Sequence, residues 1–292
     1  MSDEWFPVNR GHVEYAFLAF VMVALIQIVA CMAVKRGRAL RVFEAASGVS
    51  VAAACIFTLF VRGTFFPRQV LATLLMTAWG ARLSAYLYKR AIKIGHINVG
   101  ARIVWSLICS IPTVVANTKQ TEVYRSTSVE AFFVGAAWLA IALEFVADEQ
   151  KLAWHKQHPA DGGEDSTPRP GRADFEPPVC HTGLWAYSRH PNFFFEIMFH
   201  FAVYGVLRPV GVWPIVLCPV ALAVLIMVLP GGVLTIELQR NSLYGMYPSY
   251  VRYRDATPVL IPAPSVHHAL GLVAPHFRNV ACCELPVYEP LE

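Results

Sequence analysis

The sequence predicts an all-α fold, a polytopic membrane bundle with about seven transmembrane helices. The 292 residues are 56% hydrophobic and only 15% charged, whereas soluble domains carry roughly 25% charged residues. Apolar runs of the length that crosses a bilayer recur along the chain. None of them alternates polar and apolar residues as a strand would, and a helix satisfies its own backbone hydrogen bonds in lipid.

Seven apolar runs are interpreted as the spans, in the order 15–34, 42–61, 70–87, 103–116, 129–147, 193–207 and 212–234. A helix needs about 20 residues to cross the hydrocarbon layer. The fourth run, which Pro112 interrupts, and the sixth run are shorter than this. Each of these two is therefore interpreted either as a span or as a partly re-entrant or protein-buried helix.

Two segments differ in composition from the helical body. Residues 156–180 are rich in Pro, Gly and acidic residues, which predicts a flexible cytosolic loop. The end of the chain lacks amphipathic periodicity, so we expect it to lie along the membrane surface or to be disordered. The interpretation is a transmembrane domain over 1–262 and a C-terminal cytosolic tail over 263–292.

The distribution of Lys and Arg predicts the orientation of the chain. The net charge of +4 is mild and scattered, which excludes a nucleic-acid binder. With the first connection in the cytosol, seventeen of the 24 Lys and Arg residues fall on the cytosolic side and six on the opposite side. Cytosolic loops carry such an excess, so we expect the N-terminus outside or in a lumen and the C-terminus in the cytosol.

The sixth run carries a row of polar residues. Pro191 suits the first turn of a helix, where its missing N–H has no partner to lose. From there Asn192, Glu196, His200 and Tyr204 recur at intervals of four residues, which places them on one helical face. Polar side chains inside a span are costly and by default face the bundle interior. This row is therefore interpreted as part of a functional site.

A second polar row ends the fifth run, where Asp148 and Lys151 share one side of the helix. An ion pair at a helix end explains them equally well. The functional interpretation is that they join Arg189 in binding a charged ligand. The N–H groups and the positive potential where the sixth helix opens favour a phosphate there.

A third cluster follows the last run and comprises Glu237, Arg240, Tyr247, Tyr250 and Arg252. Aromatic and arginine side chains just past a span are ordinary interface anchors. Beside the Arg189 loop, however, they are also interpreted as a wall of a phosphate or adenine pocket. No metal module, G-x-G-x-x-G turn or Walker A motif occurs, so we expect no metal site, Rossmann fold or P-loop.

Several motifs together resemble the steroid 5α-reductase-like membrane superfamily. The most specific is GLWAYSRHPNFFFE at 183–196, which resembles the form GLWRYSRHPNYFGE of an uncharacterised branch. WGARLSAYLYKR at 79–90, ADEQKLAWHK at 147–156 and TPVLIP at 257–262 extend the similarity. In order and spacing the resemblance covers roughly residues 70–262.

The resemblance implies an enzyme that delivers a hydride from NADPH to an activated carbon–carbon double bond in a lipid. It implies that Asp148, Asn192 and Glu196 lie at the cofactor. The residues that it implies for the rest of the cofactor pocket are Arg189, His190, Tyr247 and Tyr250, while Glu237 and Arg240 match positions of the C-terminal motif. A lipid or sterol-like substrate is the expected partner, and in a eukaryote the endoplasmic reticulum is the expected compartment.

The chain departs from the family pattern at three positions: Phe193 replaces Tyr, Phe195 replaces Gly and Ala186 replaces Arg. Two other functions therefore stay open. One is a methyltransferase that uses S-adenosylmethionine, like the isoprenylcysteine carboxyl methyltransferases, and the other is a non-catalytic lipid-binding protein. The acid that stabilises a developing enolate is also open, and the candidates are Tyr86, Glu196, His200 and Tyr204.

Overall fold

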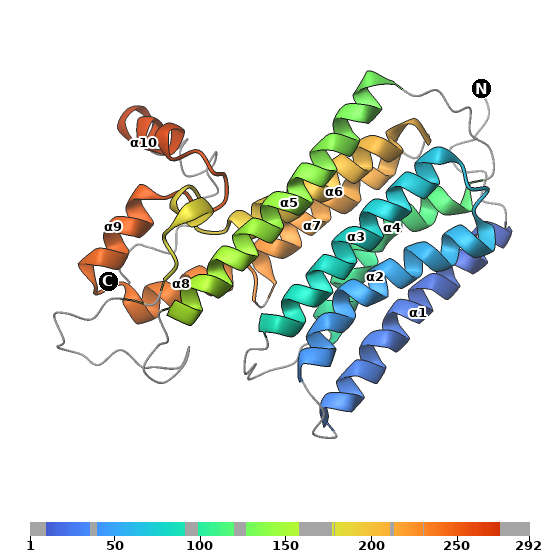
Figure 1. Ribbon diagram of the computed structural model, residues 1–292, viewed down its shortest axis with the longest axis horizontal. Helices are drawn as coiled ribbons and strands as arrows, with labels where there is room; N and C mark the ends of the chain where they lie inside the picture. The colour runs from blue at the N-terminus through green and yellow to red at the C-terminus, as the bar shows by residue number, and fades with distance from the viewer. Residues whose placement is uncertain are drawn as a thin grey trace. The chain divides into compact units, whose positions relative to one another are not determined.

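The computed structural model describes residues 10–35, 40–90, 99–119, 127–157, 177, 179–210, 213–229 and 231–274. These residues form α-helices, short 3-10 helices and turns, and none of the described residues lies in a strand (Figure 1). Seven helical segments of this part are long and apolar enough to cross a membrane. The predicted all-α fold with seven candidate spans is confirmed.

The helices follow one another along the chain as α1 (Arg10–Lys35), α2 (Leu40–Arg62), α3 (Pro67–Arg90), α4 (Val99–Thr118), α5 (Ser128–Gln157), η1 (Gly183–Ala186), α6 (Pro191–Leu207), η2 (Arg208–Val210), η3 (Trp213–Val216), α7 (Leu217–Val228), α8 (Val233–Tyr244), α9 (Pro248–Ala256) and α10 (Pro264–Val273). The candidate spans are Val13–Val34, Arg41–Arg62, Pro67–Arg90, Val99–Thr118, Ser128–Gln157, Pro191–Val210 and Leu217–Tyr244.

The two runs that the sequence left short belong to longer helices. The fourth candidate span has 20 residues and continues through Pro112, and the sixth has 20 residues and begins at Pro191. Both are therefore long enough to cross the hydrocarbon layer. The fifth helix runs to Gln157 and so carries Asp148 and Lys151 on regular helix.

The last predicted span, 212–234, corresponds to the seventh candidate span, Leu217–Tyr244. The helix is interrupted there, because α7 ends at Val228 and α8 begins at Val233. Gly231 between them has a φ of 84°, a conformation that favours glycine because it has no Cβ. A Cβ at Gly232 would strike the carbonyl oxygen of Ile226. The glycines thus end α7 and allow a new helix that carries Glu237.

Of the two expectations for the tail, disorder is wrong for its first part, and a position along the membrane surface stays a prediction. Residues 264–273 form the helix α10, which begins with Pro264 at its first position, a place that suits proline. The flexible loop expected over 156–180 lies largely outside the described residues, as does the tail beyond residue 274.

The chain divides into two compact units. The first comprises Met1–Leu139 and Met198–Val224, and the second comprises Ala140–Ile197 and Leu225–Glu292. In the first unit α1 to α4 lie side by side (Figure 1). The helices α2 and α3 approach closely at Gly48 and Gly80, where a Cβ on either glycine would strike the other's carbonyl oxygen.

Hydrogen bonds between side chains connect the helices of the first unit. Gln27 of α1 donates to the hydroxyls of Ser50 in α2 and Ser106 in α4, both at 3.2 Å. Asn117 of α4 donates to Thr58 of α2 at 3.2 Å and to Thr73 of α3 at 3.1 Å. Polar groups inside a membrane protein are stable when they are paired in this way.

Two ion pairs of the first unit join distant segments. Arg68 and Glu130 are both nearly fully buried and meet at 3.0 Å. Arg102 at the start of α4 contacts Glu44 at the start of α2 at 2.7 Å. Apolar side chains such as Phe17, Phe60 and Phe132 are instead exposed, as the lipid-facing side of a membrane helix would be.

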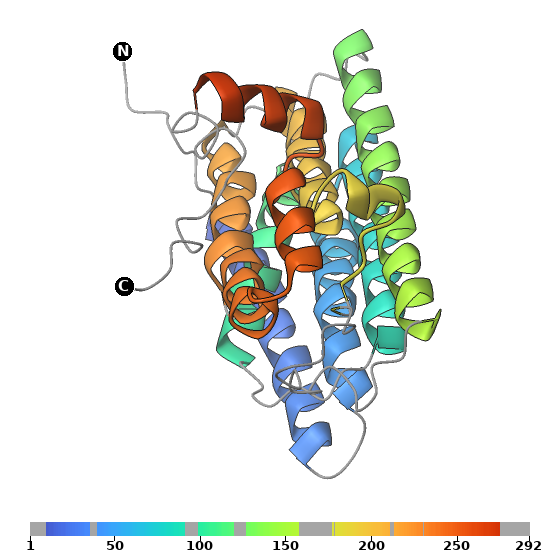
Figure 2. The ribbon, with the colours of Figure 1, turned by 90° about the vertical axis from the view of Figure 1, so that its left-hand side faces the viewer.

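The second unit contains η1, α9 and α10 besides the halves of longer helices. Here α9 and α10 are short and steeply inclined to one another (Figure 2). One apolar cluster consists of Trp154, Cys180 and Trp185. Another consists of Val179, Tyr244, Tyr247 and Tyr250. These clusters fix the segments around the site described next.

Candidate functional site

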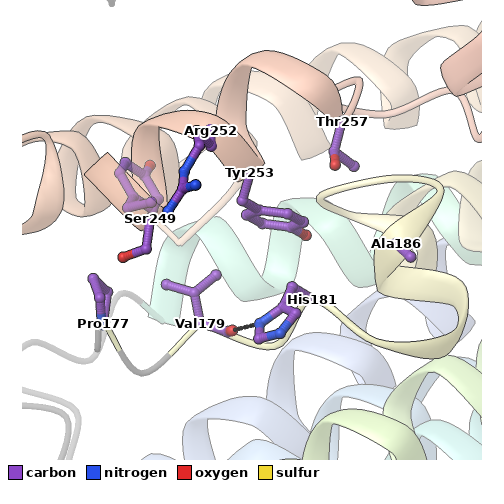
Figure 3. Close-up of a pocket in the computed structure, with 9 residues that line it drawn as sticks. Pro177, Val179, His181, Ala186, Ser249, Arg252, Tyr253 and Thr257 are labelled. Carbon is purple, nitrogen blue, oxygen red and sulfur yellow. Dashed lines mark hydrogen bonds between the residues drawn. The ribbon is translucent and has the colours of Figure 1, made fainter. Parts of the chain in front are cut away.

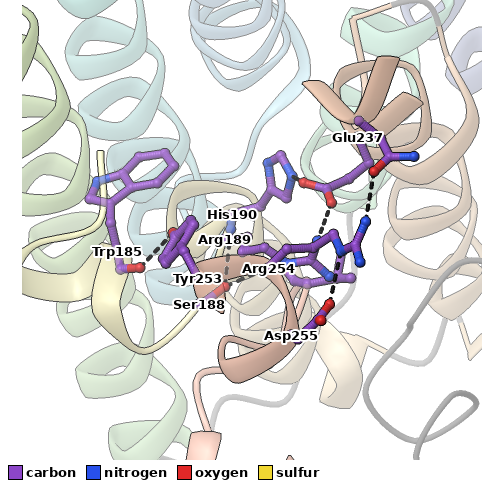
Figure 4. A network of polar contacts seen from close by, with 10 residues as sticks. Trp185, Ser188, Arg189, His190, Glu237, Tyr253, Arg254 and Asp255 are labelled. Atoms are coloured by element: carbon purple, nitrogen blue, oxygen red, sulfur yellow. Dashed lines mark hydrogen bonds and ion pairs between the residues drawn. The ribbon is translucent and has the colours of Figure 1, made fainter. Parts of the chain in front are cut away.

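A buried cluster of Arg189, His190 and Glu237 lies in the second unit (Figure 4). The Glu237 side chain has no exposed surface, and Arg189 and His190 are 1% and 2% exposed. The Arg189 guanidinium donates to one carboxylate oxygen of Glu237, and Nε2 of His190 lies 2.7 Å from the other. The cluster thereby pairs a carboxylate that could not otherwise stay ionised in the interior.

The His190 imidazole is neutral in this environment. Burial lowers its pKa to about 4, although the contact with Glu237 opposes the change. A neutral imidazole that gives its Nε2–H to the carboxylate carries no charge. The charge of Glu237 is therefore balanced chiefly by Arg189, and the pair adds no net charge to the interior.

The segment before α6 is bonded to the segment after α9. The Ser188 hydroxyl donates to the Leu260 carbonyl at 2.8 Å, and the backbone N–H of the following residue donates to the Pro258 carbonyl at 2.9 Å. We call this contact between residues 188–190 and 258–260 the clasp. It holds the arginine and histidine in place just before the first turn of α6.

A second set of contacts ties the turn η1 to α5. The Trp185 indole donates to the Ala147 carbonyl at 2.9 Å, and the Leu184 N–H donates to the side chain of Gln150 at 2.9 Å. The ammonium of Lys151 lies 5.2 Å from the centre of the Trp185 ring, a cation–π contact. The predicted site residue Lys151 thus lies beside the turn that precedes the cluster.

The remaining acidic and amide residues predicted for the site are largely buried. Asp148 and Glu196 are 2% and 6% exposed. Asn192, in the first turn of α6, is half-buried, and its side-chain oxygen is shielded from solvent without a hydrogen-bond partner among the described residues. A shielded acceptor of this kind is costly unless something donates to it.

The residues predicted after the last span fall into two groups. Tyr247 and Tyr250 are buried in the cluster with Val179. Arg240 is half-buried and Arg252 is exposed. Burial and the nearby carboxylate of α8 raise the pKa of Tyr250 to about 12, so its hydroxyl keeps its proton.

The other proposed acids, Tyr86, His200 and Tyr204, belong to the first unit. Tyr86 and His200 are buried and Tyr204 is half-buried. The His200 ring packs edge-on against Trp79, with 4.7 Å between the ring centres. Its Nε2 has no hydrogen-bond partner among the described residues. Most apolar residues of α6 are buried too, so burial alone does not set the polar row apart.

The structure also describes the three positions at which the sequence departs from the reductase-like pattern. Phe193 stacks on His190 with 5.7 Å between ring centres, so its ring covers one face of the imidazole. Phe195 is buried beside Phe194. Ala186 lies at the edge of a pocket.

This pocket of about 270 Å³ lies between α9 and the segment that leads into η1 (Figure 3). The lining side chains that carry polar groups are His181, Ser249, Tyr250, Arg252, Tyr253 and Thr257. The sequence interpretation missed His181 and Ser249. Both lie within residues 70–262, which the family resemblance covers, but only the fold brings them close together.

The structure therefore brings Arg189, His190 and Glu237 into direct contact and places Tyr250 and Arg252 on one pocket. Residues 32–99 and 97–257 match the family model DUF1295, described as a protein of unknown function. The matched range includes the residues of the cluster and of the pocket. No curated protein and no solved structure matches the chain. With seven candidate spans and a match over most of its length, the chain is a polytopic membrane protein that belongs to the DUF1295 family.

Proposed function

We propose that the protein is a membrane-embedded reductase that uses NADPH to reduce a carbon–carbon double bond in a lipid of steroid, enoyl or polyprenoid type. The signature at 183–196 supports this proposal through its resemblance to the steroid 5α-reductase-like superfamily. NADPH supplies the hydride when it is bound. The residues of the chain must hold the cofactor, orient the lipid and provide a proton.

The observation that carries the proposal is the unsatisfied amide of Asn192. Its side-chain oxygen is shielded and lacks a donor among the described residues, and leaving a buried acceptor unpaired costs about 1–3 kcal/mol. A ligand that brings an N–H group would remove this cost. The carboxamide of a nicotinamide ring has such a group, and Glu196 lies one helical turn further along α6.

The other residues fit the supporting parts of such a site. Arg189 and Glu237 satisfy each other, so their role is to position the start of α6. Lys151, Arg240 and Arg252 are cations that can contact phosphate groups, and a carboxylate such as Asp148 can accept a hydrogen bond from a sugar hydroxyl. The donor set therefore matches a phosphorylated dinucleotide.

The proposed proton donor is one of the polar residues of α6 or Tyr86. Glu196, His200 and Tyr204 occupy successive turns of one helix, and each carries a group that can donate a proton. Nε2 of His200 is shielded and lacks a partner among the described residues. An acid near the carbonyl of the substrate would stabilise the enolate that forms as the double bond is reduced.

Thermal unfolding of the detergent-purified protein tests the proposal. NADPH should raise the unfolding temperature of the native protein more than NADH does, because binding to the folded state alone stabilises it. Asn192→Ala and Glu196→Ala should lose this increase. Gln239→Ala, which changes an exposed residue of α8, should keep it and serves as the matched control.

Two results would contradict the reductase. Stabilisation by S-adenosylmethionine without any response to NADPH would indicate a methyltransferase. Absence of a response to every nucleotide, together with stabilisation by added lipid, would indicate a non-catalytic lipid-binding protein.

A further inference from the structure

The pocket beside α9 contains Arg252, which the proposed function offers to phosphate groups, and further polar side chains that the proposed function does not use. Its walls come from residues 177–186 and 249–257. Two candidate spans, Pro191–Val210 and Leu217–Tyr244, separate these walls in the chain. An even number of crossings returns the chain to the same side, so crossings by these two spans would place both walls on one side of the membrane.

The pocket is rich in hydrogen-bond donors. Tyr250 is 3% exposed, and its hydroxyl has no hydrogen-bond partner among the described residues. Burial first, and Glu237 second, raise its pKa to about 12, so the hydroxyl is a permanent donor. Among the described residues, Arg252 donates only through its Nε, in a hydrogen bond of 3.3 Å to the Pro248 carbonyl, so both terminal NH2 groups can bind a ligand.

The remaining polar residues extend this donor set. Nδ1 of His181 contacts the Val179 carbonyl at 3.1 Å, which leaves Nε2 of the ring for a ligand. Ser249, Arg252 and Tyr253 descend from α9 toward the segment that holds His181 (Figure 3). None of the described residues that line this pocket is an Asp or a Glu.

The surrounding charge also favours an anion. Arg240, Arg189 and Arg254 all act electrostatically on Tyr250, and Glu237 is the opposing charge. Glu237 is itself paired with Arg189, and the nearby Asp255 is paired with Arg254. Arg240 therefore contributes positive potential that no carboxylate among these residues cancels.

We infer that this pocket is a binding site for a phosphate monoester carried by a small molecule. Its size of about 270 Å³ lies just below the usual range of ligand pockets, roughly 300–1,000 Å³, and suits a phosphate with the sugar or glycerol next to it. A dianionic phosphate accepts hydrogen bonds from arginine and hydroxyl donors together. The phosphate can come from a soluble nucleotide or from the headgroup of an anionic lipid, since the pocket lies outside the spans.

Binding measurements with two probes test the site and separate the sources. The soluble probe is adenosine 2′-monophosphate, titrated into the detergent-purified protein with adenosine as its unphosphorylated control. The lipid probe is phosphatidic acid in nanodiscs, with phosphatidylcholine as its control. Preference for a phosphorylated probe over its control supports the inference, and the probe that is preferred identifies the source.

Variants of the pocket make the test specific. Arg252→Gln and Tyr250→Phe should each weaken binding of the preferred probe by about tenfold or more, since hydrogen bonds to a charged group are worth roughly 1.5–3 kcal/mol. Ala186→Leu should weaken it by filling the pocket without removing a polar group. Tyr187→Phe, at an exposed neighbour that does not line the pocket, should leave binding unchanged.

Equal affinity for phosphorylated and control probes would overturn the inference, as would binding that none of the three pocket variants weakens. The inference shares Arg252 with the reductase proposal and deepens it, but the two tests can fail separately. Adenosine 2′-monophosphate has no nicotinamide, so it can bind when the Asn192 test fails. The response of Asn192→Ala to NADPH can likewise persist when this pocket binds neither probe.

Discussion

At the scale of single residues, the cluster before α6 depends on one carboxylate. Glu237 has no exposed surface, and both of its oxygens are bonded, one to Arg189 and one to His190. Removing water from an ion costs several kcal/mol, which a well-placed opposite charge returns. The cost of desolvation thus offsets much of the attraction between Arg189 and Glu237, and the pair adds little net stability. Its main effect is to keep the segment before α6 attached to α8.

We expect Arg189→Met to destabilise the protein by about 3–5 kcal/mol, because it leaves the buried Glu237 without its counter-charge. The measurement is thermal or denaturant unfolding in detergent. Asp255→Asn is the matched control, since it breaks an ion pair whose carboxylate is 61% exposed and should cost about 1 kcal/mol or less.

The double variant Arg189→Met with Glu237→Leu should recover part of the lost stability, because it removes the unpaired charge as well. If Arg189→Met unfolds like the native protein, the ion pair does not hold this part of the fold.

At the scale of elements, close approach of backbones orders the first four helices. At the crossing of α2 and α3, Gly48 and Gly80 face each other, and neither has room for a Cβ. Small residues allow such contacts between membrane helices, where packing and hydrogen bonds replace the hydrophobic effect. The Ser84 hydroxyl also donates to the Ala45 carbonyl of α2 at 2.8 Å, so the two helices are bonded where they pack.

Gly48→Ala should therefore destabilise the protein by about 1–3 kcal/mol, the usual cost of overpacking. Unfolding in detergent measures the change. Gly135→Ala in α5 is the control, because no atom lies within 4 Å of its added Cβ. That variant should be neutral or more stable by up to about 1 kcal/mol, since alanine favours a helix. Equal stability of the two variants would mean that α2 and α3 can separate freely.

The sequence predicted elements where the signal is local. Apolar runs located all seven spans, and the four-residue spacing of Glu196 and His200 placed both on a buried face of α6. The break between α7 and α8 was missed, although its glycines are visible in the sequence. Hydropathy is averaged along a long window, so a break of a few residues inside an apolar stretch does not change it noticeably. The contact of Arg189 with Glu237 joins residues 48 positions apart, and no periodicity can specify such a pairing.

At the scale of the whole molecule, the odd number of candidate spans relates the two ends of the chain. Seven crossings by the candidate spans would leave the termini on opposite sides of the membrane. From the excess of Lys and Arg we predict that the C-terminal side faces the cytosol. The pocket beside α9 would then open toward soluble metabolites of the cytosol.

Reporter fusions at the two ends test this orientation. A reporter that is active only in the cytosol should work when fused after residue 292 and fail when fused before residue 1. A reporter that needs the outer or lumenal side should give the opposite pattern. Fusions that place both ends in one compartment would require an even number of crossings, and one of the candidate spans would then be wrong.

During synthesis, the clasp can form only after residue 260 has been made. Residues 188–190 are complete early, but their partners at 258–260 leave the ribosome about 70 residues later, after the last two spans have been made. A chain released at residue 245 would still insert every candidate span, yet its Ser188 hydroxyl would find no carbonyl to bind. Such a chain also lacks residues 249–257, which form one wall of the pocket, so termination before residue 249 should yield an inserted protein in which the pocket cannot form.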